Sequence, residues 1–191
     1  MNKIVWVMGQ SAAGKWTFIN YALANPESEL MQKLGLSGKN IIPAADNMYH
    51  EGFLSTESET DRAKIVDYVR SKLEGESNAA VLVKWQYTDN EQHCDTITKM
   101  MDAFPEIKIG IILLSVDGDI LYARLPNKWW WNEKTANTRE QMDDVVQVLR
   151  DNVVRWQGCG FGFEFIAEID STDGYKIIEN SELKLKAERI E

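Results

Sequence analysis

The chain has 191 residues, of which 44% are hydrophobic and 27% charged, which is the balance of one ordinary folded domain and excludes a disordered chain. Its net charge of −9 argues against a broad, non-specific nucleic-acid surface, although a local basic groove is compatible with an acidic remainder. The two cysteines lack metal-ligand spacing, so we expect free thiols. The sequence shows no signal-peptide layout and no apolar run of about 20 residues, so we expect a cytoplasmic protein with no membrane partner.

The first segment joins an apolar strand pattern at residues 3–8 to a glycine-containing loop and a helical pattern at residues 17–24. Gly9, Gly14 and Lys15 match the phosphate-binding pattern G-x-x-x-x-G-K-[ST], but Trp16 fills the hydroxyl position and the nearest hydroxyl is Thr17. In this pattern backbone N–H groups and the lysine hold a triphosphate, and the helix N-terminus favours the same anion. The alternative is an ordinary turn with a solvated lysine. We predict binding by the whole phosphate loop, which consists of Gly9, Gln10, Ser11, Ala12, Ala13, Gly14, Lys15, Trp16 and Thr17.

The middle of the chain alternates between strand and helix patterns. A polar stretch at residues 26–40 precedes a brief second strand at residues 41–45, which ends at Asp46. Residues 60–73 have helical spacing, and the continuous apolar run at residues 79–83 predicts a parallel strand covered on both faces. The residues after this run are Lys84, Trp85, Gln86 and Tyr87.

The second half continues the alternation. Residues 95–104 have a helical apolar face, and residues 107–116 form another buried strand pattern. The clearest helix follows Thr138, because one apolar stripe runs along it, made of Met142, Val145, Val146, Leu149, Val153 and Trp156. Residues 163–169 alternate as a last strand, and the polar tail from residue 175 is predicted to be a surface helix or a frayed end.

Five strands alternating with helices predict the α/β class, as a three-layer sandwich around a five-stranded parallel sheet. In such a sheet the ligand site lies at the carboxyl ends of the strands. The phosphate loop, Asp46 and the Trp85 segment all follow predicted strands, so we expect them to gather at one edge of the sheet.

With these features in order, the chain resembles the small P-loop kinases, the superfamily of nucleoside monophosphate kinases, polynucleotide kinases and small-metabolite kinases. The resemblance implies a kinase-like domain at residues 1–172 with a lid at about residues 124–139, and residues 173–191 as a C-terminal tail or surface helix. It also implies ATP and Mg²⁺ as cofactors. Four residues are implied to be catalytic: Lys15 on the phosphates, Asp46 as the base or ligand for the acceptor hydroxyl, and Arg124 and Arg139 on the transferred group. For Asp46, a turn or helix cap is the alternative.

The chain departs from this superfamily at the expected metal ligands. No acid ends the third strand, where Lys84 and Gln86 stand instead, and Trp16 replaces the loop hydroxyl. Thr17 is the predicted metal ligand. Asp46 or the nearby Asp89 are alternatives, and a further one is that the chain binds nucleotide but transfers phosphate poorly.

Seven tryptophans are present, and Trp6 and Trp156 are predicted to be core residues. Trp129, Trp130 and Trp131 form a run that no single face of a helix or strand would bury, so they either stack on a base or anchor the lid on the body or on another subunit. The residues predicted to bind the acceptor are Asp46, Trp85, Gln86, Tyr87, Lys128 and Trp130.

The sequence therefore favours an ATP-dependent kinase that phosphorylates a hydroxyl or phosphate of a nucleotide-like acceptor. A narrower version places the acceptor within DNA or RNA, as in polynucleotide kinases or phage enzymes that phosphorylate modified bases in DNA. The alternatives are a small-metabolite kinase and a nucleotide-binding regulatory protein with weakened catalysis. Binding of ATP without loss of its γ-phosphate would indicate the last of these.

Overall fold

The computed structural model describes residues 1–10, 12–44, 59–84, 90–127 and 139–179. Within them, six strands form one sheet in the order β2-β3-β1-β4-β5-β6. The strands are β1 (Lys3–Gly9), β2 (Asn40–Ala44), β3 (Ala79–Lys84), β4 (Ile109–Ser115), β5 (Phe165–Asp170) and β6 (Lys176–Ile177).

Strands β1 to β5 are parallel, as the alternating pattern predicts, but the count of five strands is wrong. The sixth strand, β6, pairs antiparallel with β5 and places Ile177 opposite Ile169 and Lys176 opposite Asp170. This strand falls in the tail for which a surface helix or a frayed end is predicted. A two-residue strand is too short to produce the period-two alternation by which strands are predicted, so the sequence pattern misses it.

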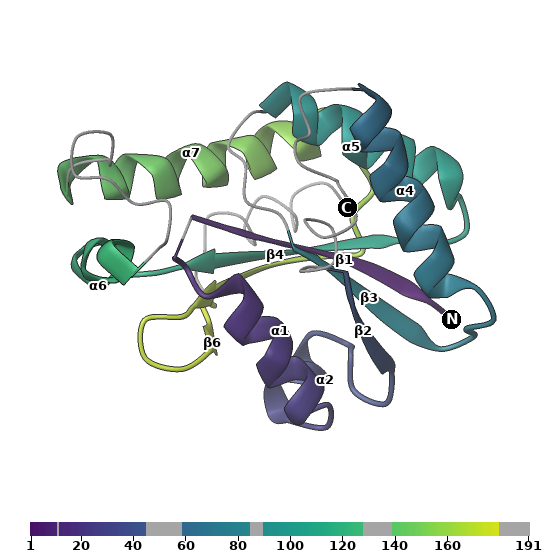
Figure 1. Ribbon diagram of the computed structural model, residues 1–191, viewed down its shortest axis with the longest axis horizontal. Helices are drawn as coiled ribbons and strands as arrows, with labels where there is room; N and C mark the ends of the chain where they lie inside the picture. The colour runs from purple at the N-terminus through teal and green to yellow at the C-terminus, as the bar shows by residue number, and fades with distance from the viewer. Residues whose placement is uncertain (11, 45–58, 85–89, 128–138, 180–191) are drawn as a thin grey trace.

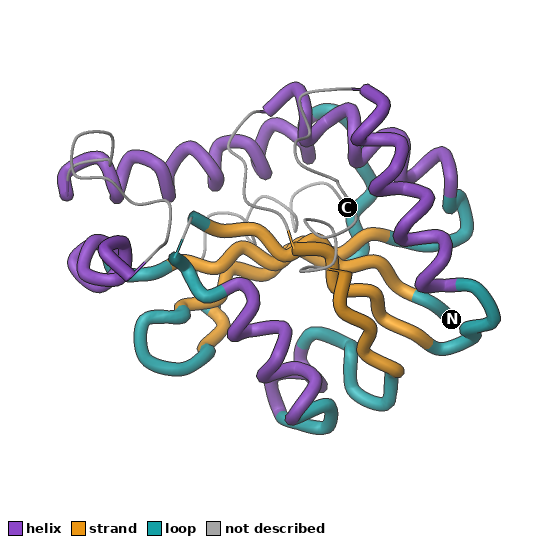
Figure 2. The backbone as a smooth tube through the Cα atoms, viewed as in Figure 1, coloured by secondary structure: helices purple, strands orange, loops and turns teal. Residues whose placement is uncertain are grey.

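Helices cover both faces of the sheet, which gives the predicted three layers (Figures 1 and 2). Three helices lie on one face: α4 (Glu59–Leu73), α5 (Asn90–Ala103) and α7 (Arg139–Gly158). The other face carries α1 (Lys15–Ala24) and α2 (Glu29–Lys33). A short helix, α6 (Gly118–Arg124), and a 3₁₀ turn, η1 (Leu125–Asn127), follow β4 at one end of the sheet.

The sheet is buried because its central strands are apolar on both sides. Alternate residues of β1 enter two separate clusters. Trp6 packs with Trp156 of α7 on one face, while Val5 and Val7 pack with Phe18 of α1 on the other. Trp6 and Trp156 are both 0% exposed, so their prediction as core residues is confirmed.

The long helices α4, α5 and α7 correspond to predicted helical patterns, whereas the short helix α2 does not. Along α7 the stripe of Met142, Val146, Leu149, Val153 and Trp156 is buried. The polar stretch at residues 26–40 contains α2, whose first turn is capped by the Ser28 hydroxyl accepting from the Met31 N–H. Among the described residues, no helix is both long enough and apolar enough to cross a membrane.

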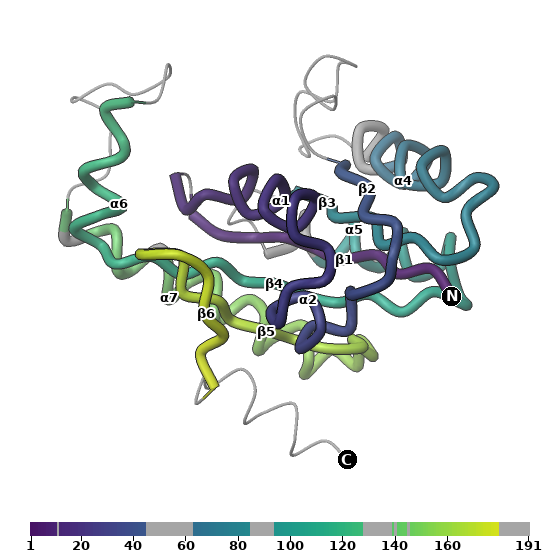
Figure 3. Tube along the Cα trace, turned by 90° about the horizontal axis from the view of Figure 1, so that it is seen from below, coloured from purple at the N-terminus to yellow at the C-terminus, as the bar shows by residue number. Residues whose placement is uncertain are grey.

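Parallel strands direct their carboxyl ends to a single edge of the sheet, and α6 lies at this edge, at the opposite end of the molecule from the N-terminus (Figure 3). The phosphate loop follows β1 there, and Ser171, the residue after β5, lies beside this loop. This edge therefore contains the candidate site.

Candidate nucleotide site

The phosphate loop turns sharply between β1 and α1 because three of its residues have positive φ: 153° at Gly9, 68° at Ala12 and 84° at Gly14. A Cβ atom on Gly9 would lie 2.9 Å from the Leu114 carbonyl oxygen, so only glycine permits β1 to pass this close to β4. Gly14 is the N-cap of α1 in the left-handed conformation. The Ala13 N–H donates to the Gln10 carbonyl oxygen at 3.0 Å and closes the loop.

Lys15 is the first residue of α1, and its side chain folds back over this loop. Its Nζ donates to the carbonyl oxygens of Gly9 at 2.6 Å and Gln10 at 2.9 Å, and the residue is only 5% exposed. The alternative of a solvated lysine is therefore wrong. A buried ammonium beside the N-terminus of a helix is suited to attract phosphate.

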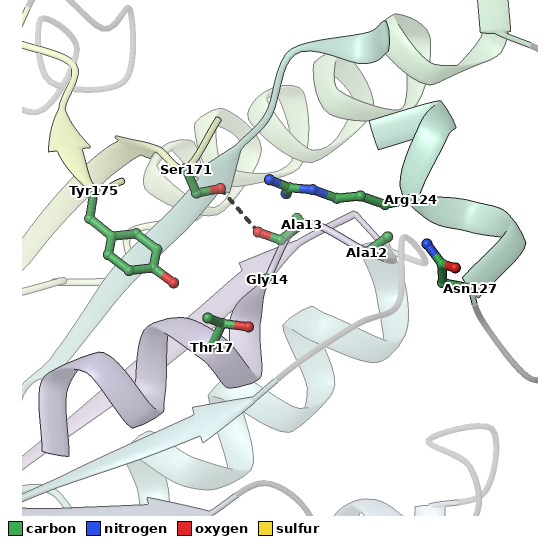
Figure 4. Close-up of a pocket in the computed structure, with 8 residues that line it drawn as sticks. All are labelled: Ala12, Ala13, Gly14, Thr17, Arg124, Asn127, Ser171 and Tyr175. Atoms are coloured by element: carbon green, nitrogen blue, oxygen red, sulfur yellow. Dashed lines mark hydrogen bonds between the residues drawn. The ribbon is translucent and has the colours of Figure 1, made fainter. Parts of the chain in front are cut away.

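A pocket of about 410 Å³ opens beside the loop (Figure 4). Two of its walls come from elements far apart in the sequence, α6 with η1 on one side and the segment after β5 on the other. Its lining residues are Ala12, Ala13, Gly14, Thr17, Arg124, Asn127, Ser171 and Tyr175. The volume and the mixed polar and aromatic lining suit a nucleoside attached to phosphates held by the loop.

The wall after β5 is held in place by hydrogen bonds to three neighbours. The Ser171 hydroxyl lies 3.0 Å from the Ala13 carbonyl oxygen, and Arg124 Nη2 donates to the Thr172 carbonyl oxygen at 3.3 Å. The Thr172 hydroxyl accepts from the Asp117 N–H at 2.9 Å. These contacts join the loop, the start of α6 and the end of β5 into one rim.

Tyr175 forms the aromatic part of this rim. Its ring packs edge-on against Phe18, with centroids 5.2 Å apart, and at a tilt against Tyr21, with centroids 5.0 Å apart. Burial raises the pKa of the Tyr175 hydroxyl above its ordinary value of 10.0, while nearby Arg124 lowers this pKa and Tyr21 raises it. The hydroxyl is therefore neutral and available as a hydrogen-bond donor at physiological pH.

The side chains of Trp16 and Thr17 point in different directions at the start of α1, because successive helical residues are about 100° apart around the helix axis. Trp16 is partly buried and packs against the apolar cluster on the α1 side of the sheet, whereas Thr17 is exposed and lines the pocket. A hydroxyl is one suitable Mg²⁺ ligand, but Mg²⁺ sites usually include carboxylates. The described residues contain no group of three or more His, Cys, Asp or Glu side chains that would hold a metal, and Thr17 as a metal ligand stays a prediction.

Arg124 and Arg139, both expected to act on the transferred phosphoryl group, lie in different places. Arg124 lines the pocket. Arg139 is the first residue of α7. Its guanidinium pairs with Asp119 of α6 and, at 3.0 Å, with Asp143 on the next turn of α7. These two hydrogen bonds raise the pKa of Arg139. Gly118 lies directly beneath this guanidinium, since a Cβ there would be 2.6 Å from Arg139 Nη1.

All six of the predicted acceptor-binding residues lie outside the described residues. They are Asp46, Trp85, Gln86, Tyr87, Lys128 and Trp130, and the loop residue Ser11 is outside as well. The structure shows only that β2 ends at Ala44 and β3 at Lys84, both at the carboxyl edge that carries the phosphate loop.

Three residues that line the pocket were not predicted: Asn127, Ser171 and Tyr175. For Ser171 a signal existed, because the polar residues that end the last strand lie at the carboxyl edge where ligands bind. Asn127 and Tyr175 carry no such signal. They are in η1 and in the turn before β6, and only the three-dimensional fold brings them to the loop.

No family model and no curated protein gives a significant match to this sequence. Solved structures do match. The tunicamycin resistance protein of Deinococcus radiodurans aligns over 100% of this chain and 94% of its own, with 14% identity and a TM-score of 0.56. The fold is P-loop kinase-like. A chain from the PezAT chromosomal toxin-antitoxin system of Streptococcus pneumoniae aligns over 97% of this chain and 76% of its own, with 14% identity and a TM-score of 0.55.

Proposed function

We propose that the protein is an ATP-dependent phosphotransferase that acts on a hydroxyl or phosphate group of a nucleotide-like acceptor. The observation that carries this proposal is the phosphate loop, in which the buried Lys15 Nζ bonds the Gly9 and Gln10 carbonyl oxygens at the head of α1. The P-loop kinase-like fold around that loop supports the same assignment.

The donor nucleotide occupies the pocket beside the loop in this proposal. Lys15 and the loop N–H groups hold the β- and γ-phosphates, and the nucleoside lies between Arg124 and Tyr175. Arg124 neutralises charge on the phosphates, because phosphoryl transfer is catalysed mainly by positioning and electrostatic stabilisation. Arg139 contributes in the same way only if it leaves Asp119 and Asp143.

The acceptor part of the proposal rests on sequence positions. Asp46 follows β2 at the carboxyl edge, where a carboxylate can take the proton from an acceptor hydroxyl. Trp85, Gln86 and Tyr87 follow β3 at the same edge, and their aromatic and amide groups suit a base. Lys128 and Trp130 add a basic and an aromatic group after η1. These groups favour a nucleotide, or a base or end within nucleic acid.

Magnesium enters no step of this proposal. ATP-dependent transfer ordinarily uses Mg²⁺ to neutralise phosphate oxygens. Here Thr17 is the one oxygen ligand proposed from the described residues, and Asp46 or Asp89 would have to complete the set.

The test is a transfer assay with γ-labelled ATP against nucleosides, nucleotides, single-stranded and duplex DNA, RNA and sugars. We expect label on a nucleotide-like acceptor. Strong salt dependence of acceptor binding would indicate a polymer, because counterion release scales with the number of phosphate contacts. Label on a sugar alone would indicate that the acceptor is a small metabolite and not a nucleotide-like molecule. Label on none of these acceptors would contradict the enzyme assignment.

A nucleotide-binding regulatory protein is the second candidate, favoured by the packing of Trp16 at the hydroxyl position of the pattern. Here the loop binds ATP and the chain does not transfer phosphate. Calorimetric binding of ATP, together with retention of its γ-phosphate in the presence of every acceptor class, would select this function over the kinase.

A further inference from the structure

One buried serine connects the carboxyl end of β5 to the phosphate loop. Ser171 is 7% exposed, and its hydroxyl lies 3.0 Å from the Ala13 carbonyl oxygen and 3.2 Å from the Ser115 carbonyl oxygen. Figure 4 shows the bond to Ala13 crossing from β5 to the loop. The Ser115 oxygen already accepts the Ser171 N–H at 2.8 Å. A hydroxyl has a single hydrogen, and the shorter contact favours its donation to Ala13.

This bond fixes the orientation of the peptide group between Ala13 and Gly14. A trans peptide is planar, with its C=O and N–H pointing in opposite directions, and the described residues contain no cis peptide. When the Ala13 carbonyl points at Ser171, the Gly14 N–H therefore points away from it. The Ala13 N–H is already committed to the Gln10 carbonyl oxygen inside the loop.

The hydrogen bond from Ser171 matters because the loop residues themselves restrict rotation of the Ala13–Gly14 peptide only weakly. Gly14 has a φ of 84° and no Cβ, so rotation of the peptide before it meets little steric resistance. Ala12 has a φ of 68°, a conformation that alanine rarely adopts, so the loop carries strain on the other side of Ala13.

We propose that Ser171 is a positioning residue for phosphate binding, which holds the Ala13 carbonyl so that the Gly14 N–H stays directed at the polyphosphate. The proposal rests on the proposed binding of a nucleoside triphosphate by the loop. Ser171 acts through the loop peptide, whereas Lys15 contacts the phosphates directly. The contribution is preorganisation, since a donor held in place before the ligand arrives loses less entropy on binding.

The test compares three ligands, namely ATP, inorganic tripolyphosphate and adenosine, by isothermal calorimetry on the full chain. The variants are Ser171→Ala, Ser171→Cys, which keeps the side-chain shape with a weaker donor, and Ser77→Ala, which removes an exposed serine far from the carboxyl edge. We expect Ser171→Ala to weaken ATP and tripolyphosphate about three- to tenfold and to leave adenosine within about twofold of wild type. Ser171→Cys should fall between wild type and Ser171→Ala, and Ser77→Ala should match wild type.

Each other outcome overturns the proposal in a distinguishable way. Unchanged tripolyphosphate binding by Ser171→Ala, when wild type binds it, overturns the role of Ser171 and leaves the nucleotide site intact. Equal weakening of adenosine and tripolyphosphate indicates collapse of the pocket, which also overturns a role specific to phosphate. If Ser171→Ala does not fold, the same ligand comparison is made with Ser171→Cys, whose melting temperature must match that of wild type. Failure of wild type to bind ATP and tripolyphosphate overturns the proposed function itself.

Discussion

Arg150 of α7 donates two hydrogen bonds to one oxygen of Glu168 on β5, from Nε at 2.9 Å and from Nη2 at 2.6 Å. The same Oε1 atom accepts the hydroxyl of Ser115 on β4. The Glu168 side chain is 3% exposed and that of Arg150 33% exposed, so a nearly buried carboxylate is neutralised by a cation at the edge of the core. This contact fastens α7 to the sheet below the carboxyl edge.

Arg150→Ala should lower the free energy of unfolding by about 2 kcal/mol, because it leaves a buried carboxylate with less compensation. The expected value is below that for a fully buried pair since Arg150 is partly solvated. Urea denaturation measures the loss. Arg155→Ala, an exposed arginine on the same helix, is the matched control and should change stability by less than about 0.5 kcal/mol. Equal effects of the two variants would contradict a structural role for the pair.

Lys15→Ala should reduce phosphoryl transfer at least about 100-fold, because it removes the cation that we propose to bind the transferring phosphates. The rate of label transfer from γ-labelled ATP measures this. The exposed Lys108→Ala is the charge-matched control and should keep wild-type rates. A Lys15→Ala variant with full activity would refute the assignment of the loop.

Arg124→Ala should raise the dissociation constant of ATP about five- to tenfold, because Arg124 lines the pocket and donates to the Thr172 carbonyl oxygen. Arg139→Ala should change the same constant less than about twofold, since its guanidinium is engaged by Asp119 and Asp143. Calorimetric titration of both variants makes the comparison. A larger effect from Arg139→Ala would reverse the placement of the two arginines relative to the donor.

Gly9→Ala should cost about 3 kcal/mol of stability, because the new Cβ would meet the Leu114 carbonyl oxygen at 2.9 Å between two central strands. Gly75→Ala tests the backbone cost alone. Gly75 also has a positive φ, 79°, but nothing lies within 4 Å of its Cβ position, so about 1 kcal/mol is expected. Chemical denaturation of both variants measures the difference, and equal losses would show that the β1–β4 contact is more yielding than the geometry indicates.

Stability should fall as the pH rises past 10.0 partly because of Tyr175. Burial keeps the folded hydroxyl protonated at a pH where the unfolded one ionises, so the folded state binds more protons and loses stability in this range. Tyr175→Phe should therefore lose less stability than wild type between about pH 8 and pH 11. Urea unfolding at both pH values tests this. Parallel losses in the two proteins would show that Tyr175 ionises normally.

The parts of the fold that were predicted correctly depend on patterns within one segment. Residues 79–83 and 107–116 are continuous apolar runs because parallel strands are covered on both faces, and they correspond to β3 and β4. The stripe on α7 was predictable for the same local reason. The phosphate loop was predictable because its glycines and lysine occupy fixed spacings that the backbone geometry requires.

The parts that were missed depend on contacts between distant segments. β6 has two residues and exists only because β5 offers an edge to pair with. Arg139 stands at the end of the predicted lid, and its role on the transferred group stays a prediction, but the two carboxylates that pair with it, on α6 and on the next turn of α7, could not be predicted from its position. The role of Ser171 follows from the approach of the β5 end to Ala13, and no spacing in the sequence encodes that distance.

The brevity of β6 has a consequence for how the protein behaves at high concentration. An open sheet presents unpaired backbone donors and acceptors along its outermost strands, and these invite pairing with another molecule. Among the described residues, the outermost strand on one side, β6, is only two residues long, and on the other side β2 contains Pro43, which has no N–H to donate. The two edge strands formed by the described residues are therefore poor templates for intermolecular strand addition, which disfavours edge-to-edge aggregation through them.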